Sequence, residues 1–301
     1  MYAYASRVRP APPGTRLLTA VSRPDAVPPP LLMLLGMVST QVGAAVAKQL
    51  FSATSPGGTT TLRLGLGALV LLVTARPALR LTWRALGLVV AFGVAMAVMN
   101  LTFYAALSRV PLGVAVTVGF AGPLVVSLLG SRRWSDVVWA VLAGTGVLLL
   151  AGLGGTRMDA LGLLLCGLTA VGWAGYVLLG KAMSGHVDGG RGLALGMAVG
   201  ALCVLPFGVV TDGAGLLDPR ILLLGLGVAL LSSVLPYSAE LAALRRMPAR
   251  VFAILLSLEP AVAALIGVVL LHELLAWSQV AGIGCVMGAA LGATLVRRED
   301  T

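Results

Sequence analysis

Charge is the property that this sequence lacks most clearly. Only 11% of its 301 residues are Asp, Glu, Lys or Arg, whereas 58% are hydrophobic and the mean hydropathy is +1.00. A soluble domain carries roughly 25% charged residues, because it needs them to cover its surface. The deficit excludes a water-soluble fold and indicates that lipid surrounds most of the chain.

Residue types that build catalytic and metal centres are also scarce. The chain has two histidines and three cysteines, and Cys166, Cys203 and Cys285 each lie inside an apolar run without CxxC or Cys/His spacing. This pattern predicts small buried side chains and indicates neither a zinc site nor a disulfide framework. Since no Ser/His/Asp set or catalytic carboxylate pair stands out, we expect no metal, no cofactor and no enzymatic activity.

Positive charge is present, with a formal net charge of +10, and arginine carries almost all of it. A basic balance of this size is compatible with nucleic-acid binding. The arginines fall in short groups between apolar runs, however, and no basic helix face or aromatic stacking platform accompanies them. This placement is typical of residues that orient a membrane protein, and it argues against nucleic acid as a partner.

Ten long apolar stretches alternate with short loops from residue 31 onward. They cover residues 31–51, 59–75, 85–107, 111–130, 137–153, 161–182, 192–211, 221–244, 249–270 and 277–296. Each is long enough to cross a hydrocarbon core of about 30 Å. The 39 glycines favour close helix packing over a β-barrel. We therefore predict an all-α integral membrane protein with ten transmembrane helices in contact with lipid.

The N-terminal segment has a different composition. Residues 1–30 contain four arginines and seven prolines and no apolar core of signal-peptide length. This composition predicts a disordered basic tail that stays in the cytoplasm. Lys and Arg in alternate loops support this orientation: sixteen fall on the side of the tail, against Arg109, Arg157 and Arg220 on the other. The bias predicts that both termini are cytoplasmic, as in a bacterial inner-membrane protein.

An internal repeat divides the ten stretches into two groups of five. Residues 104–130 align with residues 241–267 at an offset of 137, with eight identical positions that include an Arg-x-Pro motif and a downstream proline. Chance similarity between helices rich in Ala, Leu and Gly is the alternative. Because five is odd, the second copy must be inverted, an architecture that secondary transporters use. We expect five-helix repeats at 31–155 and 156–296, followed by a cytoplasmic tail at 297–301.

Ionisable groups within apolar stretches are the first candidates for function, since each costs about 2.5 to 3.5 kcal/mol at the centre of a membrane helix. Glu259 lies midway along the ninth stretch and precedes Pro260. Its carboxylate could bind an ammonium group or a proton, or it could pair with a basic residue across the bundle. Glu240 could line a cavity or form a surface pair with Arg245 and Arg246.

Two basic residues lie near the outer ends of the first two stretches. Lys48 and Arg63 could attract a substrate carboxylate or anchor at lipid headgroups. Other polar or aromatic residues at membrane depth could line a cleft or simply pack, and these are Gln41, Asn100, Tyr104, Trp173, Tyr176 and Tyr237.

Several short motifs resemble the drug/metabolite transporter superfamily, in its form with two EamA-type repeats, and within it the amino-acid exporters. They include Lys48 with Arg63, Met99-Asn100 with Phe103-Tyr104, Val110-Pro111-Leu112-Gly113, Gly122-Pro123, Pro236-Tyr237-Ser238 with Glu240, Ser257-Leu258-Glu259-Pro260, and Glu273 with Gln279. The likeness covers roughly residues 31–298. The sequence departs from the exporters at Gly119, where they have an acidic residue, and at His272, where glycine is usual.

The resemblance implies ten helices and export driven by an ion gradient, with the proton as the expected coupling ion. Together with the inverted repeat and Glu259, it predicts a secondary-active exporter of small amino acids similar to threonine and homoserine. The alternative is an exporter of the same fold that carries another metabolite or a cationic drug. A membrane scaffold without transport activity, or a membrane-embedded enzyme, is a remote alternative.

Overall fold

The computed structural model describes residues 27–77, 81–129, 134–150, 159–187, 189–244 and 246–296, and this part of the chain is helical throughout, with short connecting turns. Most of the predicted tail and residues 297–301 lie outside it. Eight of its helical segments are long and apolar enough to cross a membrane, and two shorter apolar helices cover Leu112–Val126 and Val137–Leu148. Each of the ten predicted stretches overlaps a helical segment, and residues 130 and 151–153 of these stretches lie outside the described residues.

The elements follow one another in a simple order. They are α1 (Pro29–Leu50), α2 (Pro56–Ala75), α3 (Trp83–Leu107), α4 (Leu112–Leu129), α5 (Trp134–Leu148), α6 (Ala160–Ser184), α7 (Gly189–Asp212), η3 (Gly213–Leu217), α8 (Pro219–Ala229), η4 (Leu230–Val234), α9 (Leu235–Leu244), α10 (Ala249–Leu256), α11 (Glu259–Leu271) and α12 (Trp277–Val296).

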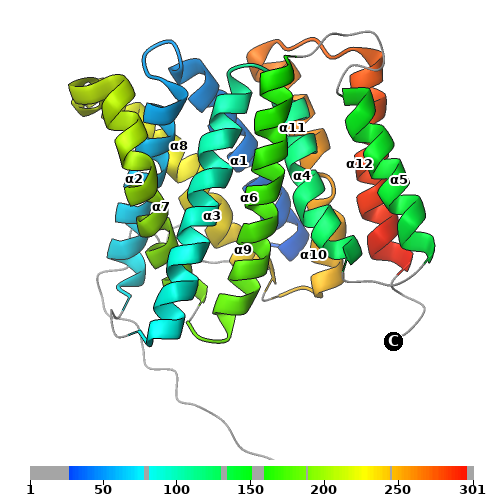
Figure 1. Ribbon diagram of the computed structural model, residues 1–301, viewed down its shortest axis with the longest axis horizontal. Helices are drawn as coiled ribbons and strands as arrows, with labels where there is room; N and C mark the ends of the chain where they lie inside the picture. The colour runs from blue at the N-terminus through cyan, green and yellow to red at the C-terminus, as the bar shows by residue number, and fades with distance from the viewer. Residues whose placement is uncertain are drawn as a thin grey trace, which may run out of the picture.

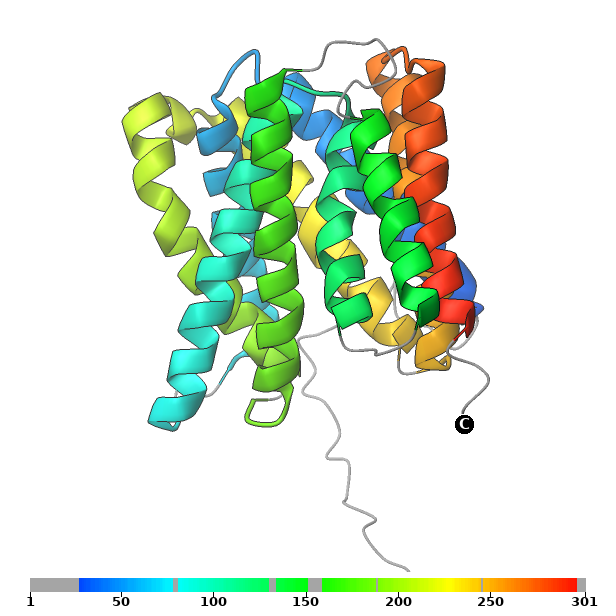
Figure 2. The same cartoon turned by 45° about the vertical axis from the view of Figure 1, so that its right-hand side comes forward.

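The helices run up and down in one bundle (Figure 1). α1 begins and α12 ends at the same end of the bundle. The other end carries the connections 51–55, 108–111 and 272–276, and we call it the Lys48 end. Figure 2 shows two groups of helices that meet around the central α9. In one group α2 and α3 pack against α7 and α6, and in the other α4 and α5 pack against α11 and α12.

Acidic residues cap four of the helices that start at the Lys48 end. In four helices a carboxylate accepts a hydrogen bond from a backbone N–H of the first turn or of the residue before it: Asp212 for α2, Glu273 for α4, Asp159 for α6 and Asp218 for α8. An anion at this position satisfies an unpaired donor and complements the helix dipole. These carboxylates are therefore committed to the scaffold.

Two predicted stretches are interrupted in the middle. The eighth contains the π-helical segment η4, and the ninth breaks at Ser257 and Leu258 into α10 and α11. Pro260 lies in the first turn of α11, where its missing N–H needs no partner. Glu259 therefore begins a helix near the centre of the bundle instead of lying inside a continuous one. Irregular backbone at this depth is typical of transporter cavities.

Candidate functional site

A cavity of about 260 Å³ lies in the centre of the bundle, where the two interrupted stretches meet α1, α2, α3, α4 and α6. Its lining residues are Thr40, Gln41, Ala44, Arg63, Met99, Asn100, Phe103, Val116, Thr169, Trp173, Tyr176, Val177, Ser232, Pro236, Tyr237, Glu240, Phe252, Leu256 and Glu259. Eight of these residues come from the first half of the sequence and eleven from the second. The cavity is thus built at the contact between them.

One wall of the cavity carries a buried guanidinium. Arg63 is only 7% exposed, and its three hydrogen bonds go to neutral groups: Ser233 Oγ at 3.2 Å, Tyr104 Oη at 3.3 Å and the Ser232 carbonyl at 2.8 Å. Its Cζ atom also lies 5.5 Å from the centroid of the Tyr104 ring. These contacts fix the side chain but leave its charge without a carboxylate partner, so the cavity presents a cation that an anion can neutralise.

The opposite charge comes from α9 and α11. Glu259 is 9% exposed, and its Oε1 accepts a hydrogen bond of 3.3 Å from Gln41 Nε2. Glu240 lines the same cavity from α9. Neither of the two ion pairs found among the described residues involves either glutamate. Glu259 is therefore held by a neutral amide and not by the basic residue that one sequence interpretation proposed.

These two glutamates differ from four other acidic residues that the structure describes. Asp159, Asp212, Asp218 and Glu273 cap helices at the Lys48 end, whereas Glu240 and Glu259 have no such role and lie in the cavity. A carboxylate that stabilises no helix and pairs with no cation is expensive to keep in a membrane protein. The cavity is thus the place where carboxyl groups remain available to a ligand.

Aromatic side chains and one amide complete the cavity. Trp173 and Tyr176 project from α6, where their rings contact Phe120 and Phe92 with centroids 5.9 and 4.8 Å apart. Asn100 is buried on α3 and donates from Nδ2 to the Met96 carbonyl at 2.8 Å. The lining thus combines charge of both signs with apolar surface, as ligand pockets do.

Seven of the nine candidate site residues line this one cavity. They are Arg63, Asn100, Trp173, Tyr176, Tyr237, Glu240 and Glu259. Tyr104 is fully buried beside it and contributes through its bond to Arg63. Lys48 lies elsewhere, at the end of α1. The interpretation of Glu240 as a cavity residue agrees with its position, while Arg245 lies outside the described residues.

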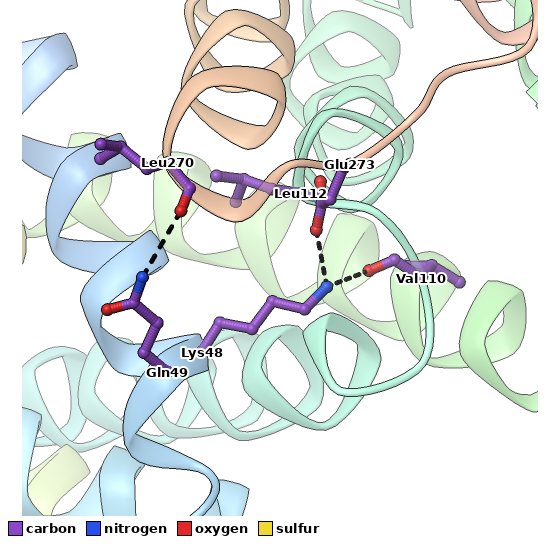
Figure 3. Close-up of polar contacts among 6 residues, drawn as sticks. All are labelled: Lys48, Gln49, Val110, Leu112, Leu270 and Glu273. Carbon is purple, nitrogen blue, oxygen red and sulfur yellow. Dashed lines mark hydrogen bonds and ion pairs between the residues drawn. The ribbon is translucent and has the colours of Figure 1, made fainter.

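Lys48 belongs to a polar cluster at the end of the bundle (Figure 3). Lys48 Nζ lies 2.7 Å from Glu273 Oε1 and donates to the Val110 carbonyl at 3.1 Å. Glu273 Oε2 accepts from the Leu112 N–H at 2.7 Å, and the neighbouring Gln49 contacts the Leu270 carbonyl at 3.5 Å. The ammonium group is thus paired within the protein, which matches neither a free substrate ligand nor a headgroup anchor.

The sequence did not reveal the importance of three groups of residues around this cavity. Gln41 was one polar group among many, although its amide holds Glu259. The adjacent Ser232 and Ser233, which hold Arg63, were a visible polar pair inside the apolar eighth stretch. Phe252 and Leu256 complete the cavity wall from α10, and no sequence signal separates them from lipid-facing residues.

Apolar helices long enough to cross a membrane, around a central cavity lined by ionisable side chains, are typical of membrane transporters. Comparison with known proteins identifies the kind of transporter: residues 160–295 match the EamA-like transporter family. The chain is 39% identical over 276 residues to the threonine/homoserine exporter RhtA of Escherichia coli K12, covering 91% of this chain and 93% of that protein. It is 40% identical over 275 residues to RhtA of Salmonella typhimurium LT2, with 90% and 93% covered.

The chain therefore belongs to the EamA-like transporter family and is a membrane transporter, not an enzyme. Its fold also resembles a protein of known crystal structure, with a TM-score of 0.58 at 20% identity, over 90% of this chain and 99% of the other. At that identity the likeness concerns the fold alone.

Proposed function

We propose that this transporter exports small zwitterionic amino acids of the threonine and homoserine type. The observation that carries the proposal is the presence of unpaired charges of both signs in one small cavity: the Arg63 guanidinium and the Glu240 and Glu259 carboxylates. A zwitterion supplies the missing counter-charge to both. The names of the relatives in Escherichia coli and Salmonella typhimurium agree with this substrate class.

The roles follow from the charges. Arg63 binds the substrate carboxylate, because two of its five N–H donors remain beyond those used by Ser232, Ser233 and Tyr104. Glu259, held by Gln41, binds the substrate ammonium group or a proton. Asn100, Trp173, Tyr176, Tyr237 and Glu240 form the remaining walls.

Cavity size separates this proposal from its alternative within the family. Pockets for drug-sized ligands measure roughly 300 to 1,000 Å³. A cavity of about 260 Å³ suits a small metabolite better. A purely cationic drug would also leave the buried Arg63 charge without a partner.

We further infer ten membrane crossings in two inverted repeats. In these repeats α1 corresponds to α6, α3 to α9 and α4 to α11. Helix contacts support this correspondence, because α3 and α4 both pack on α6, and their counterparts α9 and α11 both pack on α1. Each of α2, α4 and α5 also packs on its own counterpart, α7, α11 and α12 respectively. Contacts that occur in such matched pairs are expected from a two-fold axis between repeats. In this arrangement the positive loops place both termini in the cytoplasm and the Lys48 end outside the inner membrane.

An export assay in cells tests the proposal. Cells expressing the chain are grown on inhibitory concentrations of threonine, of homoserine and of a lipophilic cationic drug, and the efflux of radiolabelled threonine is followed directly. We expect resistance and efflux for the two amino acids and none for the drug. Resistance to the drug without amino-acid efflux would assign the cavity to the alternative cargo. Collapsing the proton gradient with an uncoupler should stop concentrative efflux if the proton is the coupling ion.

A further inference from the structure

The Lys48 cluster lies directly beyond the cavity on two helices. Ala44 of α1 and Val116 of α4 line the cavity, and Lys48 and Leu112 each lie one helical turn, about 5.4 Å, closer to the end of the bundle. Buried apolar residues fill the space at this level, and they are Ala47, Tyr104, Leu107, Leu112 and Val228. The Lys48 end of the cavity is thus closed by an apolar layer with a polar cluster above it.

The cluster connects the two halves of the chain. Glu273 belongs to the connection between α11 and α12, yet its two carboxylate oxygens contact α1 through Lys48 and α4 through the Leu112 N–H. One side chain therefore ties together two helices of the first half and caps one of them. We call this set, Lys48, Glu273, the Val110 carbonyl and the Leu112 amide, the latch.

The geometry around Glu273 is unusual for a simple surface pair. Its side chain is only 11% exposed, and the preceding His272 has a left-handed backbone with φ of 54°. That turn lets the Glu273 N–H donate to the Gly267 carbonyl at 3.1 Å, which folds the carboxylate back over α11 toward α4. A left-handed residue commonly ends a helix, and histidine adopts this conformation more readily than most residues, so the turn is a regular helix C-cap that positions Glu273.

We propose that the latch is the outer gate of the transporter, closed in this conformation, and that it must open for substrate to leave the cavity on the Lys48 side. The inference rests on the proposed export function only for the direction in which the substrate moves through the gate. In transporters built from repeats, access alternates as one half moves against the other. Any movement that separates α1 and α4 from the α11–α12 connection must break both contacts of Glu273, the one with Lys48 Nζ and the one with the Leu112 N–H.

A probe cysteine at the outer wall of the cavity tests the gate. Val116→Cys places a thiol in the cavity one turn below Leu112, and a membrane-impermeant maleimide is added to right-side-out and inside-out vesicles. Labelling of residue 116 is measured by peptide mass spectrometry, so Cys166, Cys203 and Cys285 can remain in place. Right-side-out vesicles report access through the latch, and inside-out vesicles report access from the opposite end.

Two variants weaken the latch in different ways. Glu273→Gln removes the charge but keeps an acceptor for the Leu112 N–H, and Lys48→Met removes the ion pair but keeps the cap of α4. In both we expect residue 116 to be labelled at least about tenfold faster from the outside, the shift that corresponds to ~1.4 kcal/mol of lost preference for the closed state. Export by the same variants, measured with Val116 intact, should fall because the gate no longer closes fully.

Arg109→Gln is the matched control. Arg109 forms the other ion pair that the described residues show at this end, 2.7 Å from Asp159, but the two side chains are 43% and 37% exposed and Asp159 caps α6. The hydrogen bond from Arg109 lowers the pKa of Asp159, yet an exposed pair of this kind stabilises little. We expect labelling of residue 116 to remain at the parent rate in this variant.

The outcomes separate the gate from the export proposal. Folded Glu273→Gln and Lys48→Met proteins that label at the parent rate would overturn the gate, whatever they transport. If Glu273→Gln fails to fold, Lys48→Met alone decides. Faster labelling in a chain that exports neither threonine nor homoserine would keep the gate and reject the substrate class.

Discussion

At the scale of single residues, burial without an ionic partner distinguishes the groups that we propose bind the substrate from the groups that hold the scaffold. Lys48 and Glu273 neutralise each other at 2.7 Å, and Asp212 is satisfied by Ser55. Arg63 and Glu259, by contrast, have only neutral partners. The contrast separates charged groups that are paired within the scaffold from ionisable groups whose ionic partner we propose to be the substrate.

Replacing Arg63 tests the carboxylate site. Arg63→Gln should raise the KM for threonine export by at least about tenfold, because a hydrogen bond to a charged group contributes ~1.5 to 3 kcal/mol. Tyr104→Phe is the control, since it removes one acceptor of Arg63 but keeps the guanidinium. Its KM should stay within about threefold of the parent, and an equal loss in both variants would point to general damage of the cavity wall.

Replacing Glu259 tests the ammonium or proton site. Glu259→Gln keeps the shape and an acceptor for Gln41 but removes the titratable charge, so the protein should fold and concentrative export should fail. Transport normalised to folded protein, measured across external pH, checks this. Loss of a buried ion pair would instead cost roughly 3 to 5 kcal/mol and lower the melting temperature. Wild-type export with the wild-type pH dependence would remove Glu259 from the mechanism.

At the scale of helices, the prolines that match in the two aligned segments have different structural consequences. Pro123 lies inside the continuous α4, whereas Pro260 follows the break between α10 and α11. The preceding residues differ accordingly. Glu259 faces the cavity, while a side chain at Gly122 would collide with the Ala170 carbonyl of α6. Close packing of α4 on α6 thus requires glycine at the position that aligns with Glu259.

This packing predicts an unequal response to the same substitution on neighbouring helices. Gly122→Ala should destabilise the protein by ~1 to 3 kcal/mol, because the added methyl group forces α4 and α6 apart. Gly144→Ala on α5 is the control, since a methyl group there meets no atom within 4 Å. Thermal unfolding in detergent compares the two, and a loss at Gly144 as large as that at Gly122 would contradict the packing argument.

At the scale of the whole molecule, the loop charges and the proposed inverted arrangement together predict that both termini face the cytoplasm. A reporter active only in the cytoplasm should be bright when fused after Thr301 or inserted between Arg246 and Pro248. It should be dark within residues 213–220, which follow α7. A bright signal at 213–220 would mean that the second half has the opposite orientation in the membrane, and it would contradict the inverted arrangement.

Much of this architecture was predictable from the sequence alone. Hydropathy depends on each segment separately, so the apolar stretches, the membrane environment and the polar candidates at membrane depth could be found without a structure. Lining residues such as Glu259, Arg63 and Trp173 were also detectable, because charge or a polar aromatic group inside an apolar run is conspicuous. The repeat and the loop charges further predicted the orientation that the reporter experiment tests.

Only the tertiary structure decided which of these groups act together. Lys48 and Glu273 are 225 residues apart, and Gln41 and Glu259 are 218 apart. Their pairing depends on how distant helices pack, which no local pattern contains. Packing turned Lys48 from a candidate substrate ligand into part of a latch, and it brought Arg63, Glu240 and Glu259 to one cavity. The sequence by itself determined where charge enters the membrane, whereas the fold determined which charges are neutralised there and which remain for a ligand.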